Sequence, residues 1–338
     1  MAAGRPSGAL GLTMKEAISG LDAATYKPHA LHDLAQDWPE TNCYTDLWIE
    51  VLQALGVAPQ AMLGFTLRQD FEGDQFTFFK TPLEDLEELF GISVGELAIF
   101  DDLEKHIATQ ATRGRLVLVE VDAFFLPDTR EVSYRSSHSK TTIGVNGIDL
   151  VAKRLTYFHN AGYFELEAED YEGLFAMFRH ARAGGHLFPY AEFAKIPANV
   201  RRPSRPLCEK ILARHLKNRP ELNPFRSWQK HIVAEVEDLR SRPEGYFHVY
   251  AFNTLRQAGA NFALLATHLE WLDATGYSRE VMAAKEISQN AKSMQFQLAR
   301  ALARRKTQAL YESVTPMADA WDRLMLALES RSDIPQAA

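Results

Sequence analysis

Apolar residues recur at helical spacing soon after the first forty residues. They fall at positions 47, 48, 51, 52 and 55, which share one face of an α-helix. Asn42 is a favourable N-cap for this helix, and Gly56 favours its end. The pattern therefore predicts a helix that begins at Cys43, so that the thiol lies in the first turn.

Strand patterns follow in the same half of the chain. Residues 115–122 are β-branched and mostly apolar, as expected of a central strand. Alternation over 138–145, turn chemistry at 147–150 and an apolar run over 151–158 predict a β-hairpin that His138 opens. Further helices are expected at 82–90, at 94–112 and from residue 169 onward.

The second half of the chain is helical in pattern. It follows a Pro- and Arg-rich stretch at 196–206, which we interpret as a linker or surface crossing. We therefore expect an α+β protein with a disordered tail over 1–13, a domain of mixed helices and strands over 14–195 and an all-helical domain over 207–330. Helix-period apolar patterns cover residues 206–216, 225–240, 249–272, 279–306 and 307–328.

Composition narrows the possible functions. The chain has 338 residues, of which 46% are hydrophobic and 24% charged, as in ordinary globular proteins. The net charge of −7 argues against a general nucleic-acid binder. No apolar run approaches the roughly 18 residues that span a bilayer, and the first residues lack a signal-peptide pattern. Two cysteines form no disulfide framework. We expect a cytoplasmic protein without a membrane or nucleic-acid partner.

Cys43 is the first candidate for chemistry. Unpaired backbone N–H groups and the positive end of the dipole at a helix start favour a thiolate, which is the nucleophilic form. The alternative is a buried structural cysteine, since cysteine is among the most buried residue types. Gln36 lies seven residues earlier and could donate its side-chain N–H to a developing oxyanion.

The predicted hairpin suggests a base for this nucleophile. A turn at 147–150 would place His138 opposite His159 and beside Asn160, within ~8 Å across the strands. Asp149 would lie more than ~30 Å away along the strand, so Asn160 is the group expected to orient His138. Cys, His and Asn in this order are a known arrangement for thiol nucleophiles. His159 is either a second base or a structural residue.

Several blocks carry a resemblance to known families. The Gln36, Asn42-Cys43, His138 and Phe158–Asn160 elements resemble the papain-like layout. They are most similar to bacteriocin-processing peptidases and to the N-terminal domain of the butirosin-biosynthesis acyltransferase family, which also shows a strand ending like Val121–Pro127. The whole chain resembles a bacterial family of unknown function encoded near amino acid:carrier-protein ligases. Its shared blocks are Asn42–Tyr44, Asp70–Asp74 and Tyr157–Tyr163.

The resemblance implies that residues 14–195 form a papain-like catalytic domain, whose cleft the helical domain over 207–330 helps to shape, and that its activity is thiol-dependent acyl transfer. Cys43 would take an acyl or aminoacyl group from a carrier-protein thioester, and His138 would shuttle the proton. Asn160 would orient His138, Gln36 would stabilise the oxyanion, and a small amine would accept the acyl group. The phosphopantetheine arm would arrive with the carrier protein, so no metal or other cofactor is expected for this chain.

Two departures and two alternatives accompany this expectation. Peptidase-type relatives usually carry Asp where Asn160 stands and a small residue where Tyr44 stands, so Tyr44 could narrow access to the thiol. A cysteine hydrolase, either a thioesterase or a peptidase, would use the same site with water as acceptor. A non-catalytic scaffold that binds a carrier protein would leave Cys43 unreactive.

Four acidic residues are candidate substrate contacts. Asp70, Glu72 and Asp74 lack the remaining ligands of a calcium loop, so we interpret them either as solvated loop acids or as a site for the acceptor amine. Asp122 ends the strand over 115–122 and lies near the predicted active-site edge. We therefore expect Asp122 to contact substrate.

Overall fold

The computed structural model describes the chain except residues 1–13, 182–186, 244, 305–307 and 333–338. The predicted tail over 1–13 lies outside the described residues. The chain divides into two compact units, and each is described by itself. The sheet unit contains the described residues up to Ala24 with Gly95–Tyr157 and Phe164–Ile196. The helical unit contains Thr25–Val94, Phe158–Tyr163 and the described residues from Pro197 onward.

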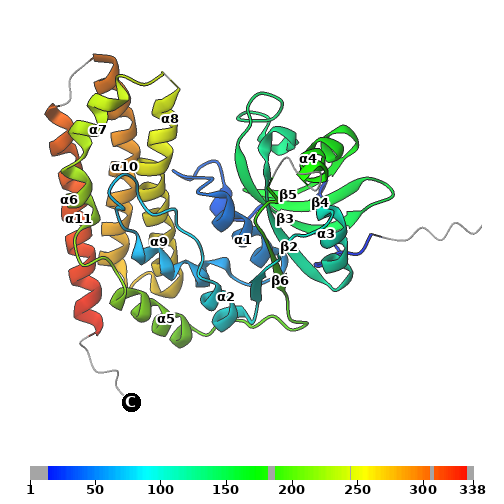
Figure 1. The fold of residues 1–338 in the computed structure, drawn as a ribbon. Coiled ribbons are helices and arrows are strands. Elements are labelled where there is room, and N and C mark those ends of the chain that lie inside the picture. The colour runs from blue at the N-terminus through cyan, green and yellow to red at the C-terminus, as the bar shows by residue number, and fades with distance from the viewer. Residues whose placement is uncertain (1–13, 182–186, 244, 305–307, 333–338) are drawn as a thin grey trace, which may run out of the picture. The chain divides into compact units, whose positions relative to one another are not determined.

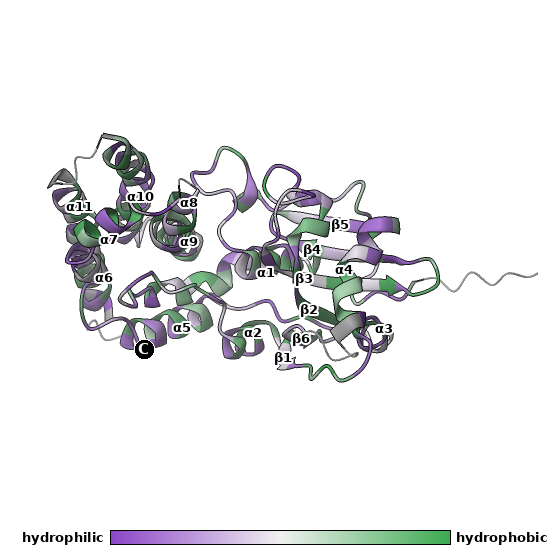
Figure 2. Cartoon of the chain, turned by 45° about the horizontal axis from the view of Figure 1, so that its top comes forward, coloured by the Kyte–Doolittle hydropathy of each residue, from purple (hydrophilic) through white to green (hydrophobic). Residues whose placement is uncertain are grey.

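A six-stranded sheet confirms the α+β class. Its strand order is β1-β6-β2-β3-β4-β5 (Figure 1, and Figure 2, in which all six strands are labelled). The central strand β2 pairs antiparallel with β3 on one side and with β6 on the other. The strands are β1 (Ser93–Glu96), β2 (Arg115–Asp122), β3 (Lys140–Asp149), β4 (Arg154–His159), β5 (Gly162–Glu167) and β6 (Ala191–Lys195).

Two helices share the core of the sheet unit. Ile107 of α3 (Leu103–Thr112) and Leu174 of α4 (Ala168–Ala181) are buried in the same cluster as Val119 and Ile143 of the central strands. This burial explains the run of β-branched residues in β2, because a strand covered by packed side chains must be apolar. The predicted strand over 115–122 is confirmed to the residue.

The predicted hairpin turn at 147–150 is wrong. Asn146 and Gly147 lie inside β3, where the chain's own N-terminal segment pairs with them: Glu16 bridges Gly147, and Ile18 exchanges two hydrogen bonds with the Asn146 side chain. The loop comes three residues later, over 150–153. Its first turn is closed by Asp149 Oδ1, which accepts backbone N–H groups at 2.9 Å.

Three strands of the sheet were missing from the predictions. The helix predicted over 94–112 begins only at Leu103, because residues 93–96 form the short strand β1 and Leu97 N–H donates to Ala191 of β6. The strands β5 and β6 were not predicted. Both are short, with burial patterns that alternate only in part.

Helices make up the second unit. The predicted helix after Asn42 is confirmed as α1, and the predicted helix over 225–240 divides into α6 and α7. Along α9 to α11, hydrophobic and hydrophilic residues alternate around the helices (Figure 2). The helices are α1 (Cys43–Ala54), η2 (Pro59–Arg68), α2 (Leu83–Phe90), α5 (Arg205–Lys217), α6 (Pro224–Gln229), α7 (Ile232–Leu239), α8 (Tyr246–Ala251), α9 (Gln257–Asp273), α10 (Ser278–Arg304) and α11 (Gln308–Ser332).

The helical unit includes segments from the first half of the chain. The 3₁₀ helix η2 packs against both α9 and α5, and α1 packs against η2. The β4–β5 turn also belongs to this unit, since Phe158 and Tyr163 pack on Tyr26 with ring centroids 6.2 and 5.6 Å away. Cys43, as the first residue of α1, therefore belongs to the helical unit.

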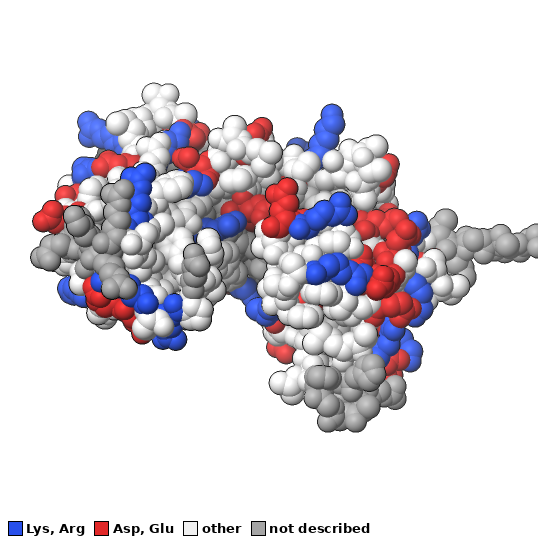
Figure 3. Space-filling model, turned by 90° about the horizontal axis from the view of Figure 1, so that it is seen from above, with Lys and Arg blue, Asp and Glu red and all other residues white. Residues whose placement is uncertain are grey.

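Charged side chains of both signs are interspersed on the face drawn in Figure 3. Many are paired locally: Arg226 of α6 contacts Asp319 and Asp322 of α11, and Arg214 of α5 contacts Asp85 of α2. Asp85 is buried, whereas an exposed pair such as Arg226 with Asp319 contributes little to stability, so the helical unit depends mainly on its buried apolar faces. None of the described helices combines the length and the apolar character needed to cross a bilayer.

Candidate functional site

Cys43 is the first residue of α1, as predicted. The side-chain oxygen of Asn42 accepts a hydrogen bond from Thr45 N at 3.0 Å, which caps the helix. The Asn42 amide donates in turn to the Phe79 carbonyl at 2.8 Å, so the cap is tied to a second segment. Cys43 is a free, half-buried thiol. It therefore combines partial access with a position at the N-terminal end of a capped helix.

A buried ionic network lies on the same helix. His32 Nδ1 lies 2.5 Å from Glu50 Oε1, and His32 Nε2 lies 3.5 Å from Asp46 Oδ1. Asp46 also accepts hydrogen bonds from the backbone and hydroxyl of Thr41. Burial alone would lower the pKa of His32, but the hydrogen bonds to Asp46 and Glu50 outweigh it and raise the pKa to about 9. His32 is therefore a cation at neutral pH.

The segment before Cys43 is anchored to α9 and α10. Trp38 is buried against Gly259 and donates its indole N–H to Ser288 at 2.9 Å. Lys292 donates to the Asp37 carbonyl at 2.7 Å. Arg256, in a π-helical turn, donates to the carbonyl of Glu40 at 2.7 Å. These bonds fix the path of the chain that leads into α1.

Gln36 lies on this same segment. Its side chain is exposed and lines a cavity of about 500 Å³ together with Thr41, Ser288 and Lys285. This places the amide on the approach to α1. Its contact with an oxyanion stays a prediction.

His138 is held by a carboxylate in the sheet unit. Its Nδ1 lies 2.5 Å from Asp122 Oδ2, and its ring stacks on Phe124 with centroids 4.5 Å apart. The other oxygen of Asp122 accepts the backbone N–H groups of Ser139 and Phe124. The His138 side chain is 71% exposed. A carboxylate on Nδ1 selects the tautomer whose Nε2 can accept a proton.

The β2–β3 register explains this pair. It sets Asp122 opposite Lys140, two residues after His138. The hairpin register that was predicted to place His138 opposite His159 does not hold, because the β3–β4 loop comes later. The carboxylate that we expected to contact substrate is therefore the residue that orients His138.

Asn160 forms part of the turn between β4 and β5. Its φ in this two-residue turn is 41°, a left-handed conformation that Asn tolerates better than most residues. Its action on His138 stays a prediction. His159, the last residue of β4, is buried.

The acidic loop is a small hairpin in the helical unit. Phe71 bridges Phe76, Asp70 Oδ1 accepts from Phe71 N–H at 2.7 Å, and Glu72 accepts from the Thr77 hydroxyl. Burial, together with the nearby Glu72 charge, raises the pKa of Asp70. Within the described residues, no group of three or more His, Cys, Asp and Glu side chains is arranged to hold a metal ion.

Asp74 and Tyr44 differ in their surroundings. Asp74 is exposed at the tip of the acidic loop. Tyr44 is buried, and the Lys80 ammonium lies 4.4 Å from the centre of its ring. The Tyr44 ring therefore contacts the segment next to the acidic loop. Whether it narrows access to the thiol stays a prediction.

Two family models match nearly the whole chain. The DUF1839 N-terminal domain covers residues 27–196, and the DUF1839 C-terminal domain covers residues 204–330. The chain belongs to the DUF1839 family. The two DUF1839 regions meet at the Pro- and Arg-rich stretch, and their names assign no activity. No curated protein matches the chain. Chemistry in this DUF1839 chain must therefore be argued from its residues.

The partner network of α1 was not predicted from the sequence, and Asp122 was predicted as a substrate contact and not as the partner of His138. Asp46 and Glu50 stand four residues apart among the buried positions of α1, and such acids in a buried helix need a partner. That spacing was the available signal, although nothing local identifies His32 as the partner. The Asp122–His138 contact could have been found by pairing the strand over 115–122 with the strand after His138.

Proposed function

We propose that this protein is a thiol-dependent acyltransferase with a papain-like catalytic arrangement. The Cys43 thiolate attacks the carbonyl of a carrier-protein thioester, the bond from that carbonyl to the carrier sulfur breaks, and the carrier thiol leaves with a proton that His138 donates. The acyl group is then a thioester on Cys43. An amine attacks this thioester, His138 accepts the amine proton, and the Cys43 thiolate leaves as an amide forms.

The contrast between the two cysteines carries the proposal. Cys43 is half-buried at a capped helix start, whereas Cys208 is buried within α5, where burial raises its pKa to about 11. A nucleophile needs access and a stabilised anion, and Cys208 lacks both. The Asp122–His138 pair supports the role of His138 as proton acceptor, because the His138 imidazole is exposed and a carboxylate orients it.

The donor and the oxyanion contact rest on the resemblance to the acyltransferase family. That resemblance implies a carrier-protein thioester as donor and Gln36 as an oxyanion donor. An aminoacyl or acyl group would enter on the phosphopantetheine arm of the carrier.

The test is the intact mass of the protein after incubation with acyl-loaded carrier protein. We expect wild type and Cys208→Ala to gain the mass of the acyl group, and Cys43→Ala to gain nothing. Added amine should then remove the adduct from wild type and yield an amide. The proposal is overturned if no variant gains mass, or if Cys43→Ala gains as much as wild type.

A hydrolase with the same residues is the second candidate. It is favoured by the exposure of His138, since an open imidazole can activate water as readily as an amine. Product analysis with and without amine separates the two, because a hydrolase releases free acid at the same rate in both. A scaffold without catalysis would leave Cys43 slow to react with iodoacetamide at neutral pH.

A further inference from the structure

A polar cavity lies beside the start of α1 in the helical unit. Its volume is about 500 Å³, and the acidic loop, the end of η2 and α9 form its walls. Phe79 and Lys80 belong to the lining. Phe79 accepts the hydrogen bond from Asn42, and Lys80 lies over the Tyr44 ring. The lining is therefore joined to the residues on both sides of Cys43.

Two buried amides in the lining keep an unused acceptor. Gln69 donates from Nε2 to the Thr77 carbonyl at 3.0 Å, and Asn261 donates from Nδ2 to the Thr66 carbonyl at 2.7 Å. Reversing either amide would set oxygen against oxygen, so these bonds fix both orientations. Gln69 Oε1 and Asn261 Oδ1 then have no hydrogen-bond partner among the described residues, although both side chains are buried.

Buried acceptors without donors are rare in proteins and call for an explanation. Here they belong to the same cavity as two carboxylates, Asp70 and Glu72. Asp70 is partly withdrawn from water, and the nearby Glu72 charge disfavours its ionised form. A ligand that brings positive charge and several N–H or O–H donors would satisfy all four groups at once.

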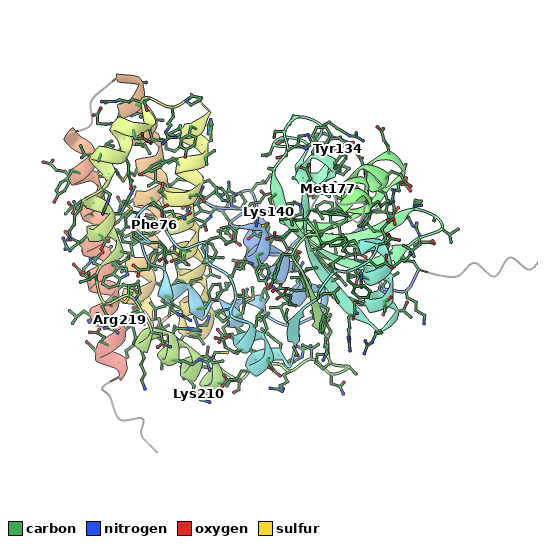
Figure 4. All side chains as sticks on the ribbon, viewed as in Figure 1. Phe76, Tyr134, Lys140, Met177, Lys210 and Arg219 are labelled. Carbon is green, nitrogen blue, oxygen red and sulfur yellow. The ribbon has the colours of Figure 1, made fainter. Side chains whose placement is uncertain are left out.

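Among the described residues, the lining holds three cations: Arg68 is exposed, and the other two are engaged elsewhere. Arg219 (Figure 4) donates to the Leu216 carbonyl and pairs with Glu329 of α11. Lys80 is held over the Tyr44 ring. Phe65 and Phe79 contribute aromatic wall, with ring centroids 6.5 Å apart, against which an alkylammonium can pack.

The loop that carries the two acids is firmly placed. Phe76 (Figure 4) packs against Phe225 and Trp228, with centroids 5.4 and 5.6 Å away. Its backbone N–H donates to the carbonyl of Asn253 in the π-helical turn at 3.0 Å. Because π-turns interrupt the regular helix ladder, they expose a carbonyl for such a bond. The acids are therefore presented from a fixed loop.

We propose that this cavity binds a small primary ammonium compound that carries further hydrogen-bond donors. Asp70 and Glu72 face its charge, and the amide oxygens of Gln69 and Asn261 accept from its donors. The assignment of this cavity as the subsite of the acceptor amine rests on the proposed acyl transfer. The binding of an ammonium compound does not depend on that transfer.

The probe pair is 2-amino-1,3-propanediol and glycerol, which share a skeleton and differ in the ammonium group. Ligand-observed NMR titration of the full chain measures the binding of both compounds. Every protein in this experiment carries Cys43→Ala, which excludes covalent reaction. We expect the amine to bind and glycerol not to bind. Asp70→Asn should weaken the amine by about tenfold or more, because a charged hydrogen bond is lost.

Two variants serve as checks. Glu87→Gln removes an exposed acid of α2 that lies outside the cavity, and it should bind like Cys43→Ala alone. Asn261→Leu removes the unused acceptor on α9, a different wall from the acidic loop, and should weaken binding while the loop keeps its own hydrogen bonds. Equal binding of the two probes, no binding of the amine, or full binding by Asp70→Asn would overturn the proposal.

The outcomes separate this inference from the proposed function. Amine binding without an acyl adduct on wild type would leave the cavity standing and refute the transfer. An acyl adduct on wild type without amine binding would support the transfer and refute the proposed amine site in the cavity. If both hold, the amine should speed loss of the adduct in wild type but not in Asp70→Asn.

Discussion

The stability of the helical unit should depend on pH through His32. Its pKa is raised from 6.5 to about 9 because, despite burial, Asp46 and Glu50 stabilise the imidazolium. At about 1.4 kcal/mol for each tenfold change in proton affinity, this corresponds to about 3 kcal/mol of folding free energy. A raised folded pKa contributes fully below the unfolded value. The stabilisation is therefore complete below about pH 6.5 and is lost as the pH rises through 9.

Urea unfolding of wild type and His32→Gln at pH 6 and pH 10 measures this contribution, because the two pH values lie below the unfolded pKa of 6.5 and above the folded pKa of about 9. Tryptophan fluorescence reports the transition, since Trp48 of α1 is fully buried. The variant should be less stable than wild type by about 3 kcal/mol at the lower pH, and the difference should shrink at the higher pH. His248→Gln, at an exposed position, is the matched control and should follow wild type. A difference between wild type and His32→Gln that stays constant with pH would refute the reasoning.

Three further changes have defined expectations. Asp122→Asn should lower the rate of acyl transfer by about 100-fold, measured as kcat/KM, because an amide stabilises an imidazolium poorly. Iodoacetamide should modify Cys43 in the folded protein and Cys208 only after unfolding; peptide mass mapping that finds both modified together would contradict the burial difference. Gly259→Ala would place a methyl 2.4 Å from a Trp38 ring atom and should destabilise the protein by about 1–3 kcal/mol; an unchanged urea midpoint would show that the contact yields freely.

The helix at Cys43 was predictable because its signals are local. Asn42 caps it through Thr45, and the apolar positions that follow are buried. Each signal lies within one or two turns of the residue that it fixes. The same holds for α2, which ends at Gly91 with a φ of 76°. Element type and one boundary could thus be inferred without any tertiary contact.

The hairpin register could not be predicted in this way. Asn146-Gly147 is strong turn chemistry by itself, yet both residues lie in β3 because a segment well over a hundred positions earlier pairs with them. A few residues of displacement in the turn reassign every pair across the hairpin. The predicted neighbour of His138 therefore changed although both strands were predicted.

The buried partners of α1 show a second limit. Asp46 and Glu50 required a compensating group, but His32 reaches them through a loop with no regular pattern beyond a short 3₁₀ turn. A buried charged residue indicates that a compensating partner exists, but the sequence does not show which residue it is. The same is true of Gln69 and Asn261, whose unused oxygens emerge only once the cavity lining is known.

The position of Asp122 changes the chemistry that can be proposed for His138. The peptidases that the sequence resembles usually carry Asp where this chain has Asn160, and that departure made peptidase activity less expected. A carboxylate nevertheless contacts Nδ1 here, supplied by the end of β2. It stabilises the imidazolium that forms when the base takes a proton, whereas an amide mainly fixes the tautomer. Asn160 is explained by its left-handed turn, so the proposed transfer does not require it near the imidazole.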